Sequence, residues 1–135
     1  MVLSAATRRE VVHGIIAVHV SGSRPDSAPL DRVTRDKVLV EVAGRLAATV
    51  RWTDSVTRLG DQEFAALIEG RSADQIAVVA ARILDRVSGT LHCGGRPVVI
   101  TASLGMAVAS PGADADVVLL HAEQAMRAAI SSDST

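Results

Sequence analysis

The chain has 135 residues, 48% of them hydrophobic and 21% charged, a size that suits one domain with one core. Fourteen basic residues against fifteen acidic ones give a formal net charge of −1, so we expect no nucleic-acid partner held by general electrostatics. The longest uncharged stretch, residues 97–113, is broken by prolines, glycines and hydroxyl residues and falls short of the ~20 apolar residues that span a bilayer, so we expect no membrane insertion.

The rare residue types argue against several kinds of site. The single cysteine, Cys93, cannot form an internal disulfide, and no signal-peptide pattern opens the chain, so we expect a cytoplasmic protein. Trp52 and Phe64 are too few to build an aromatic platform for RNA. His13 and His19 stand about 20 Å apart if they share one strand, which is too far to share a metal ion.

The first predicted elements are a strand, a loop and a helix. Residues 11–20 are rich in Val and Ile and predict a buried strand, whereas residues 21–30 contain two prolines, a glycine and three serines and predict a loop. A helix should follow, with Asp31 as its N-cap and its end near Arg51. Its apolar stripe consists of Val38, Val42, Leu46 and Val50.

The middle of the chain predicts a hairpin and a second helix. Residues 55–59 and 63–68 are two short strand patterns, and the glycine that opens their connection, Gly60, predicts a primed turn. The second helix has Asp74 in its first turn and Gly89 as its stop.

The last third predicts a long strand and a final helix. Residues 98–110 are apolar on both faces, as in a covered sheet, with residues 91–93 as a hairpin partner. A final helix should run from about residue 116 to residue 130. Strands and helices that alternate around a central hairpin predict an α/β or α+β domain close to the ferredoxin-like β-α-β-β-α-β plan, with helices flanking a central sheet.

The stretch from Arg51 to Phe64 resembles the signature region of GGDEF domains, the catalytic units of diguanylate cyclases. Where the family has Gly-Gly-Asp/Glu-Glu-Phe after an arginine and an apolar residue, this chain has Gly-Asp-Gln-Glu-Phe. The resemblance implies a single degenerate GGDEF domain over residues 11–130, with tails at 1–10 and 131–135, and a nucleotidyl-cyclase-like sheet of antiparallel or mixed strands. Further matches at the family's spacing lie at residues 36–39, 80–83, 101–105 and 122–126.

The positions that carry catalysis in the family hold other residue types here. Family cyclases condense two GTP molecules across a dimer, with magnesium held by an aspartate that ends the first strand and by an acidic third signature residue. These positions fall on His19 and Gln62, and Glu63 alone supplies too few carboxylate oxygens for this hard cation. Asp61 replaces the second signature glycine and would repel a triphosphate. We therefore expect no catalytic residues, no bound metal and no magnesium cofactor.

The family's nucleotide pocket is also altered in this chain. Ser27 falls where the family has a guanine-reading asparagine, while Asp36 is kept, so these two residues would form a vestigial guanine site. Arg24 keeps the charge of a family lysine. Ile130 stands where the family's last helix supplies a lysine for phosphate.

One family site keeps all three of its residue types. Many diguanylate cyclases have an inhibitory site for their product, cyclic di-GMP, built from an Arg-x-x-Asp motif and an arginine of the next helix. Arg51, Asp54 and Arg82 fall on these positions. Guanidinium groups can donate paired hydrogen bonds to guanine or phosphate, and a carboxylate can accept from guanine. In a purely structural alternative, Arg51 neutralises a helix C-terminus and Asp54 caps the next loop.

The leading functional hypothesis is a catalytically inactive GGDEF domain of bacterial second-messenger signalling. This pseudoenzyme would bind cyclic di-GMP and relay the signal to a partner signalling domain or within a homodimer. A structural or dimerising module that binds no ligand is the first alternative. A GTP-sensing regulatory domain or residually active cyclase is the second, and Asp36 and Glu63 favour it.

Overall fold

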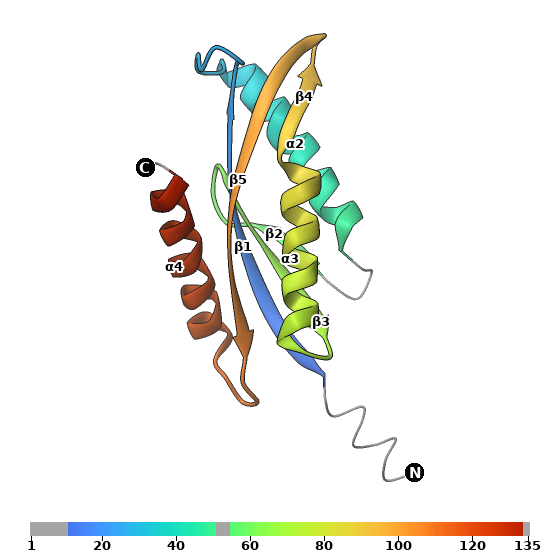
Figure 1. Cartoon of the computed structure of the whole chain (residues 1–135), viewed down its shortest axis with the longest axis vertical. Coiled ribbons are helices and arrows are strands. Elements are labelled where there is room, and N and C mark those ends of the chain that lie inside the picture. The colour runs from blue at the N-terminus through green and yellow to red at the C-terminus, as the bar shows by residue number, and fades with distance from the viewer. Residues whose placement is uncertain (1–10, 51–54, 134–135) are drawn as a thin grey trace.

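The computed structural model describes residues 11–50 and 55–133, in which five strands and three helices follow one another (Figure 1). None of these three helices is long and apolar enough to cross a membrane. The elements are β1 (Val12–Ser23), α2 (Arg32–Thr49), β2 (Ser55–Arg58), β3 (Glu63–Gly70), α3 (Ala73–Val87), β4 (Gly89–Cys93), β5 (Arg96–Ala109) and α4 (Ala115–Asp133).

The five strands form one sheet in the order β2-β3-β1-β5-β4, and every neighbouring pair is antiparallel. The ferredoxin-like plan is therefore confirmed for β1, β3, β2 and β5, and β4 is added at one edge as the hairpin partner of β5. Of the two arrangements that the resemblance left open, antiparallel or mixed, the described strands form the antiparallel one.

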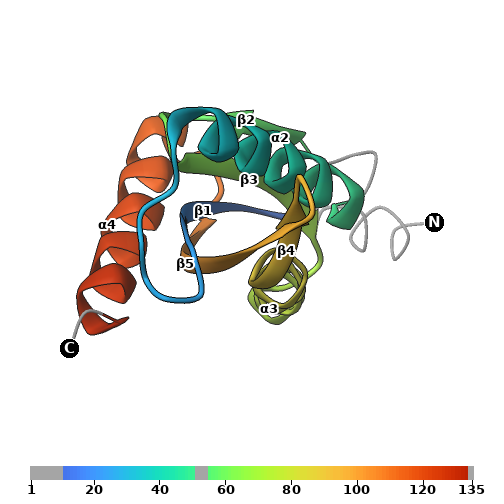
Figure 2. The ribbon, with the colours of Figure 1, turned by 90° about the horizontal axis from the view of Figure 1, so that it is seen from above.

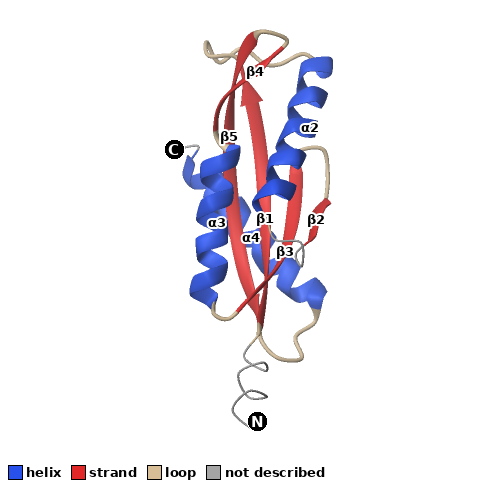
Figure 3. Cartoon of the chain, turned by 90° about the vertical axis from the view of Figure 1, so that its right-hand side faces the viewer, coloured by secondary structure: helices blue, strands red, loops and turns tan. Residues whose placement is uncertain are grey.

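Helices cover both faces of the sheet. Figure 3 shows α2 and α3 in front of it and α4 behind, and the view along the long axis places α4 and α3 on opposite sides of β1 and β5 (Figure 2). The main core lies between the sheet and helices α2 and α3. Alternate residues of each strand point to this face of the sheet and bury their side chains there. Its fully buried side chains include Ile16, Val18, Val20, Leu46, Ile68, Ile76, Ile83 and Val98.

Helix α4 packs on the opposite face through very small residues. Ala17 of β1 pairs with Gly105 of β5, and both are buried beneath the helix. A Cβ atom added at Gly105 would run into the main chain of α4 at Met126 N and Ala122 O. The absence of a side chain at Gly105 therefore lets the helix lie directly on the strand.

The helix ends confirm several sequence predictions. Asp31 is the N-cap of α2, and its carboxylate accepts a hydrogen bond from the Thr34 amide at 2.7 Å, which lowers the Asp31 pKa. Helix α3 ends at Val87 with Ser88 as its C-cap, and Gly89, the predicted stop, follows directly with a φ of 121°. The N-cap of α3 is Ser72, which accepts from the Gln75 amide at 3.2 Å and was not predicted.

Three local predictions were wrong. Strand β1 continues to Ser23 because its last residues pair with β5, and α4 continues past residue 130 to Asp133. Strands β2 and β3 and the loop between them carry the signature and are called the signature hairpin below. This hairpin has no primed turn, since no residue from 60 to 62 has a positive φ. Instead, Arg58 closes a wider loop by donating its Nε to the Gly60 carbonyl at 2.8 Å and its Nη2 to the Asp61 carbonyl at 3.0 Å.

Candidate functional site

The end of β1 meets the signature hairpin. His19 and Glu63 are direct cross-strand partners, and both are half-buried. The Val20 amide donates to the Gln62 carbonyl at 2.9 Å and ties the two segments together. The structure thus places side by side the three residues that the resemblance assigns to the family's metal site, His19, Gln62 and Glu63.

These residues do not suit magnesium. Glu63 is the one carboxylate among them, and it stands beside an imidazole and a neutral amide, whereas magnesium prefers several oxygen ligands in octahedral geometry. Within residues 11–50 and 55–133, no cluster of three or more His, Cys, Asp or Glu is placed to hold a metal ion. The chemistry of the side chains therefore does not fit the metal that the family implies.

A polar pocket of about 320 Å³ separates the hairpin from the start of α2. Asp36 lines it, whereas Ser27, the other residue predicted for a vestigial guanine site, is not among its lining residues. The residues around the pocket are Arg32, Arg35, Asp36, Leu39, Arg58, Asp61 and Gln62. The arginines of α2 were missed by sequence reasoning, although their spacing of three places both on one face of the helix.

The loop before α2 explains where Ser27 lies. Its side chain is exposed, its φ is 68°, and its amide donates to the Arg24 carbonyl at 2.8 Å within a tight turn. The Arg24 guanidinium donates to the Pro97 carbonyl at 3.4 Å instead of facing the hairpin. Ile130 packs with the small apolar cluster beneath α4.

A second pocket, of about 230 Å³, lies where the end of α2, the end of β3 and the middle of α3 converge. Arg82 lines it on α3, and Val50 lines it directly before Arg51 in the sequence. Arg51 and Asp54 themselves lie outside the described residues. The pocket is lined by Thr49, Val50, Ile68, Glu69, Gly70, Gln75, Val78, Val79 and Arg82.

Local hydrogen bonds fix the walls of this second pocket. At the end of α2 the Thr49 hydroxyl donates to the Arg45 carbonyl at 2.6 Å. At the start of α3 the Arg71 amide donates to the Gln75 side chain at 2.6 Å. Sequence reasoning missed Glu69 and Gln75, although the very short link between β3 and α3 could have shown that they lie near Arg82.

A third pocket, of about 440 Å³, lies at the other end of β1 and is mostly apolar. His13 lines it, 4.0 Å from the Glu69 carboxylate, together with residues of the β5–α4 connection. No predicted site residue lines it, so its size alone does not make it the functional site.

The fold and the signature hairpin define a nucleotidyl-cyclase-like domain, and comparison with known proteins identifies its family. The sequence model described as "Diguanylate cyclase, GGDEF domain" matches residues 33–134. The chain belongs to the GGDEF family. It is 36% identical over 92 residues to the bifunctional diguanylate cyclase/cyclic di-GMP phosphodiesterase MucR of Pseudomonas aeruginosa, a match that covers 67% of this chain and only 13% of MucR.

Solved structures support the same assignment. An EAL/GGDEF domain protein of M. capsulatus is 28% identical, with a TM-score of 0.75, and the match covers 89% of this chain and 79% of that one. The GGDEF domain of DgcB from Caulobacter crescentus, solved in complex with c-di-GMP, has a TM-score of 0.77 at 21% identity and covers 96% of this chain and 78% of its own. The second likeness shows a shared fold.

Proposed function

We propose that this GGDEF domain is catalytically inactive and binds cyclic di-GMP through Arg51, Asp54 and Arg82. The observation that carries the proposal is that Arg82, far from Arg51 in sequence, lines the same pocket as Val50, the residue that precedes Arg51. In the structural alternative, the Arg-x-x-Asp motif only caps a helix and a loop, and nothing would then require an arginine such as Arg82 in this pocket. We propose further that the domain acts in the cytoplasm and relays binding to a signalling partner or a second copy.

The pocket offers the two kinds of surface that a cyclic dinucleotide needs. Ile68, Val78 and Val79 supply apolar atoms on which a flat base can pack, and Arg82 supplies a guanidinium for guanine or phosphate. Because Arg82 is exposed on α3, it can reach a ligand that sits across the mouth of the pocket. That the DgcB domain of the same fold was solved with c-di-GMP supports this choice of ligand.

Loss of catalysis is proposed from the signature hairpin. The half-buried pair His19 and Glu63 offers one carboxylate where the family uses two metal-binding acids, so we propose that the function needs no magnesium cofactor. The Asp61 carboxylate adds negative charge where a triphosphate would have to bind.

Calorimetric titration with cyclic di-GMP tests the binding proposal. Truncation of Arg51 to Ala should weaken binding by roughly tenfold to 150-fold, because it removes a charge-assisted contact worth about 1.5–3 kcal/mol. Asp54→Ala should act similarly and Arg82→Ala less. Arg71→Ala, which has the same Arg-x-x-Asp spacing elsewhere, and Arg127→Ala on α4 are the matched controls and should bind as the wild type does.

Absence of binding at high micromolar ligand, or equal losses in the Arg51 and Arg71 variants, would contradict the proposal. A structural module that binds no ligand would then be the better account.

The arginine-lined pocket beside Asp36 favours GTP sensing as the second candidate. GTP binding that Arg35→Ala abolishes and Arg82→Ala spares would support that candidate.

A further inference from the structure

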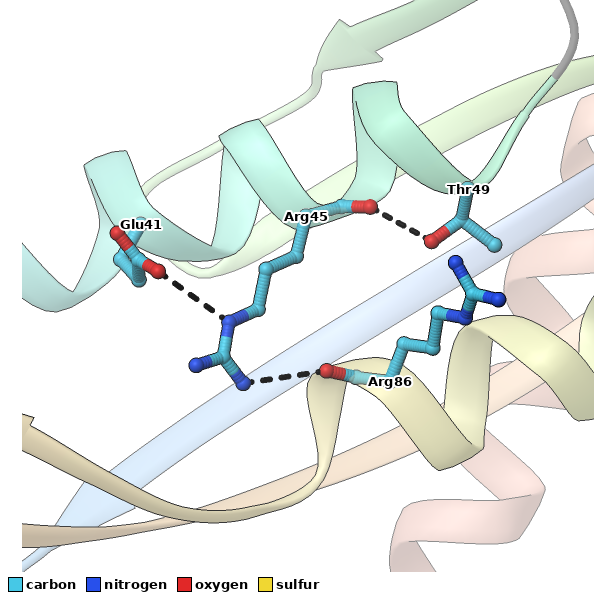
Figure 4. A network of polar contacts seen from close by, with 4 residues as sticks. All are labelled: Glu41, Arg45, Thr49 and Arg86. Atoms are coloured by element: carbon cyan, nitrogen blue, oxygen red, sulfur yellow. Dashed lines mark hydrogen bonds and ion pairs between the residues drawn. The ribbon is translucent and has the colours of Figure 1, made fainter.

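One arginine connects the two helices that line the Arg82 pocket, α2 and α3. Arg45 of α2 donates its Nη1 to the main-chain carbonyl of Arg86 on α3 at 3.2 Å (Figure 4). Its Nε donates to the Glu41 carboxylate at 3.3 Å. Its own carbonyl accepts from the Thr49 hydroxyl, so a single residue contacts both helices and the last turn of α2.

This bridge lies next to the Arg82 pocket without forming part of its wall. Arg82 precedes Arg86 by one helical turn, and Thr49, which lines the pocket, follows Arg45 by one turn. Arg45 itself is not among the lining residues. It therefore lies where it can set the spacing of the pocket walls while leaving the ligand untouched.

The chemistry of the bridge is specific to arginine. The Arg86 carbonyl belongs to the last turn of α3, where carbonyls lack partners within the helix and partial negative charge gathers. The Arg45 guanidinium donates its Nη1 to this carbonyl and complements the negative end of the helix dipole. Because the group is planar with several fixed donors, its Nε can at the same time donate to the Glu41 carboxylate. Lysine has no such fork and could not keep both contacts in the same geometry.

We propose that Arg45 is a positioning residue that holds α3 against α2 and so fixes the place of Arg82 relative to Thr49 and Val50, which line the same pocket. The proposal rests on the cyclic di-GMP site proposed above. It predicts that ligand affinity depends on a residue that never touches the ligand.

Hydrogen exchange on the ligand-free protein tests the bridge by itself. Arg45→Ala should speed exchange of the Val87 and Ser88 amides by about fivefold, as expected when one hydrogen bond of ordinary strength is lost. Arg45→Lys should give a smaller increase. Arg86→Ala is the matched control, because it keeps the carbonyl that Arg45 contacts and should leave these amides near wild-type rates. Unchanged exchange in Arg45→Ala would overturn the inference whatever the ligand does.

A double-mutant cycle tests the effect on binding. Arg45→Ala should weaken cyclic di-GMP binding by about threefold to tenfold in the wild type and should have little further effect in Arg82→Ala, because residues that act through one another are not additive. Additive losses, or wild-type affinity in Arg45→Ala, would overturn this inference and leave the ligand site standing. A wild-type protein that binds no cyclic di-GMP would remove the proposed function and this consequence together, even if the exchange result held.

Discussion

Ser27 is the non-glycine residue with a positive φ in the described part of the chain, at 68°. Residues that carry a Cβ atom, with asparagine as the main exception, enter this left-handed region at a cost in free energy, because Cβ crowds the following carbonyl. The turn holds it there through the Arg24 carbonyl, which accepts from the Ser27 amide, and through the Ala28 amide, which donates to Asp26 at 3.1 Å. The backbone at Ser27 thus adopts a conformation that asparagine tolerates better than serine.

Substitutions at Ser27 should reveal this conformation. Ser27→Val should lower the free energy of unfolding by about 1–2 kcal/mol, because a β-branched side chain is least tolerated in the left-handed region. Ser27→Asn should raise it by about a few tenths of a kcal/mol. Urea denaturation measures both, and equal stabilities of the two variants would contradict the strained turn.

Among the elements, α4 depends on one missing side chain. Gly105→Ala should lower the free energy of unfolding by about 3 kcal/mol, the upper end for overpacking, because the new Cβ meets helix backbone that cannot rotate away. Gly44→Ala on the exposed face of α2 is the matched control, with open space around the new methyl group. It should raise stability by about 0.5–1 kcal/mol through helix propensity. Thermal and urea unfolding of both variants would check the contrast.

The sequence predicted elements whose patterns are local. The stripe of α2, its Asp31 cap and the stop of α3 at Gly89 are confirmed because side-chain periodicity and caps act within a few residues. The end of β1 was wrong because Ser21–Ser23 have little strand propensity and form strand only by pairing with Val99–Thr101, far along the chain.

The candidate site also separates what local patterns predict from what long-range contacts decide. Arg82, which the family resemblance singled out, lines one pocket together with Thr49 and Val50 at the end of α2. Sequence reasoning did not foresee that Asp36 lines the polar pocket while Ser27 does not, because the prolines and the tight turn set the path of the loop. It also missed the bridge from Arg45 to Arg86, since a main-chain carbonyl leaves no mark in the sequence.

Over the whole molecule, the positions that the resemblance assigns to catalysis come from segments far apart in the chain, β1 and the connection between β2 and β3. We expect no cyclic di-GMP from GTP with magnesium or manganese above a buffer control. The triple variant His19→Asp, Asp61→Gly, Gln62→Asp should remain poorly active, because the loop at Ser27 and the apolar Ile130 stay unchanged. Product formation by the triple variant at the rate of an intact cyclase would show that the hairpin alone decides activity.

The central place of β1 in the sheet has a consequence for folding during translation. This strand leaves the ribosome before its partners, yet it pairs with β3 on one edge and with β5 on the other, where His13 meets Ala109. Until β5 emerges, a nascent chain exposes an open strand edge lined by apolar residues, the kind of surface that aggregates or recruits chaperones. Pairing across such long stretches of sequence also slows folding. The sheet therefore closes only once β5 has been made, and a pause in translation before β5 would leave the chain exposed to misassembly.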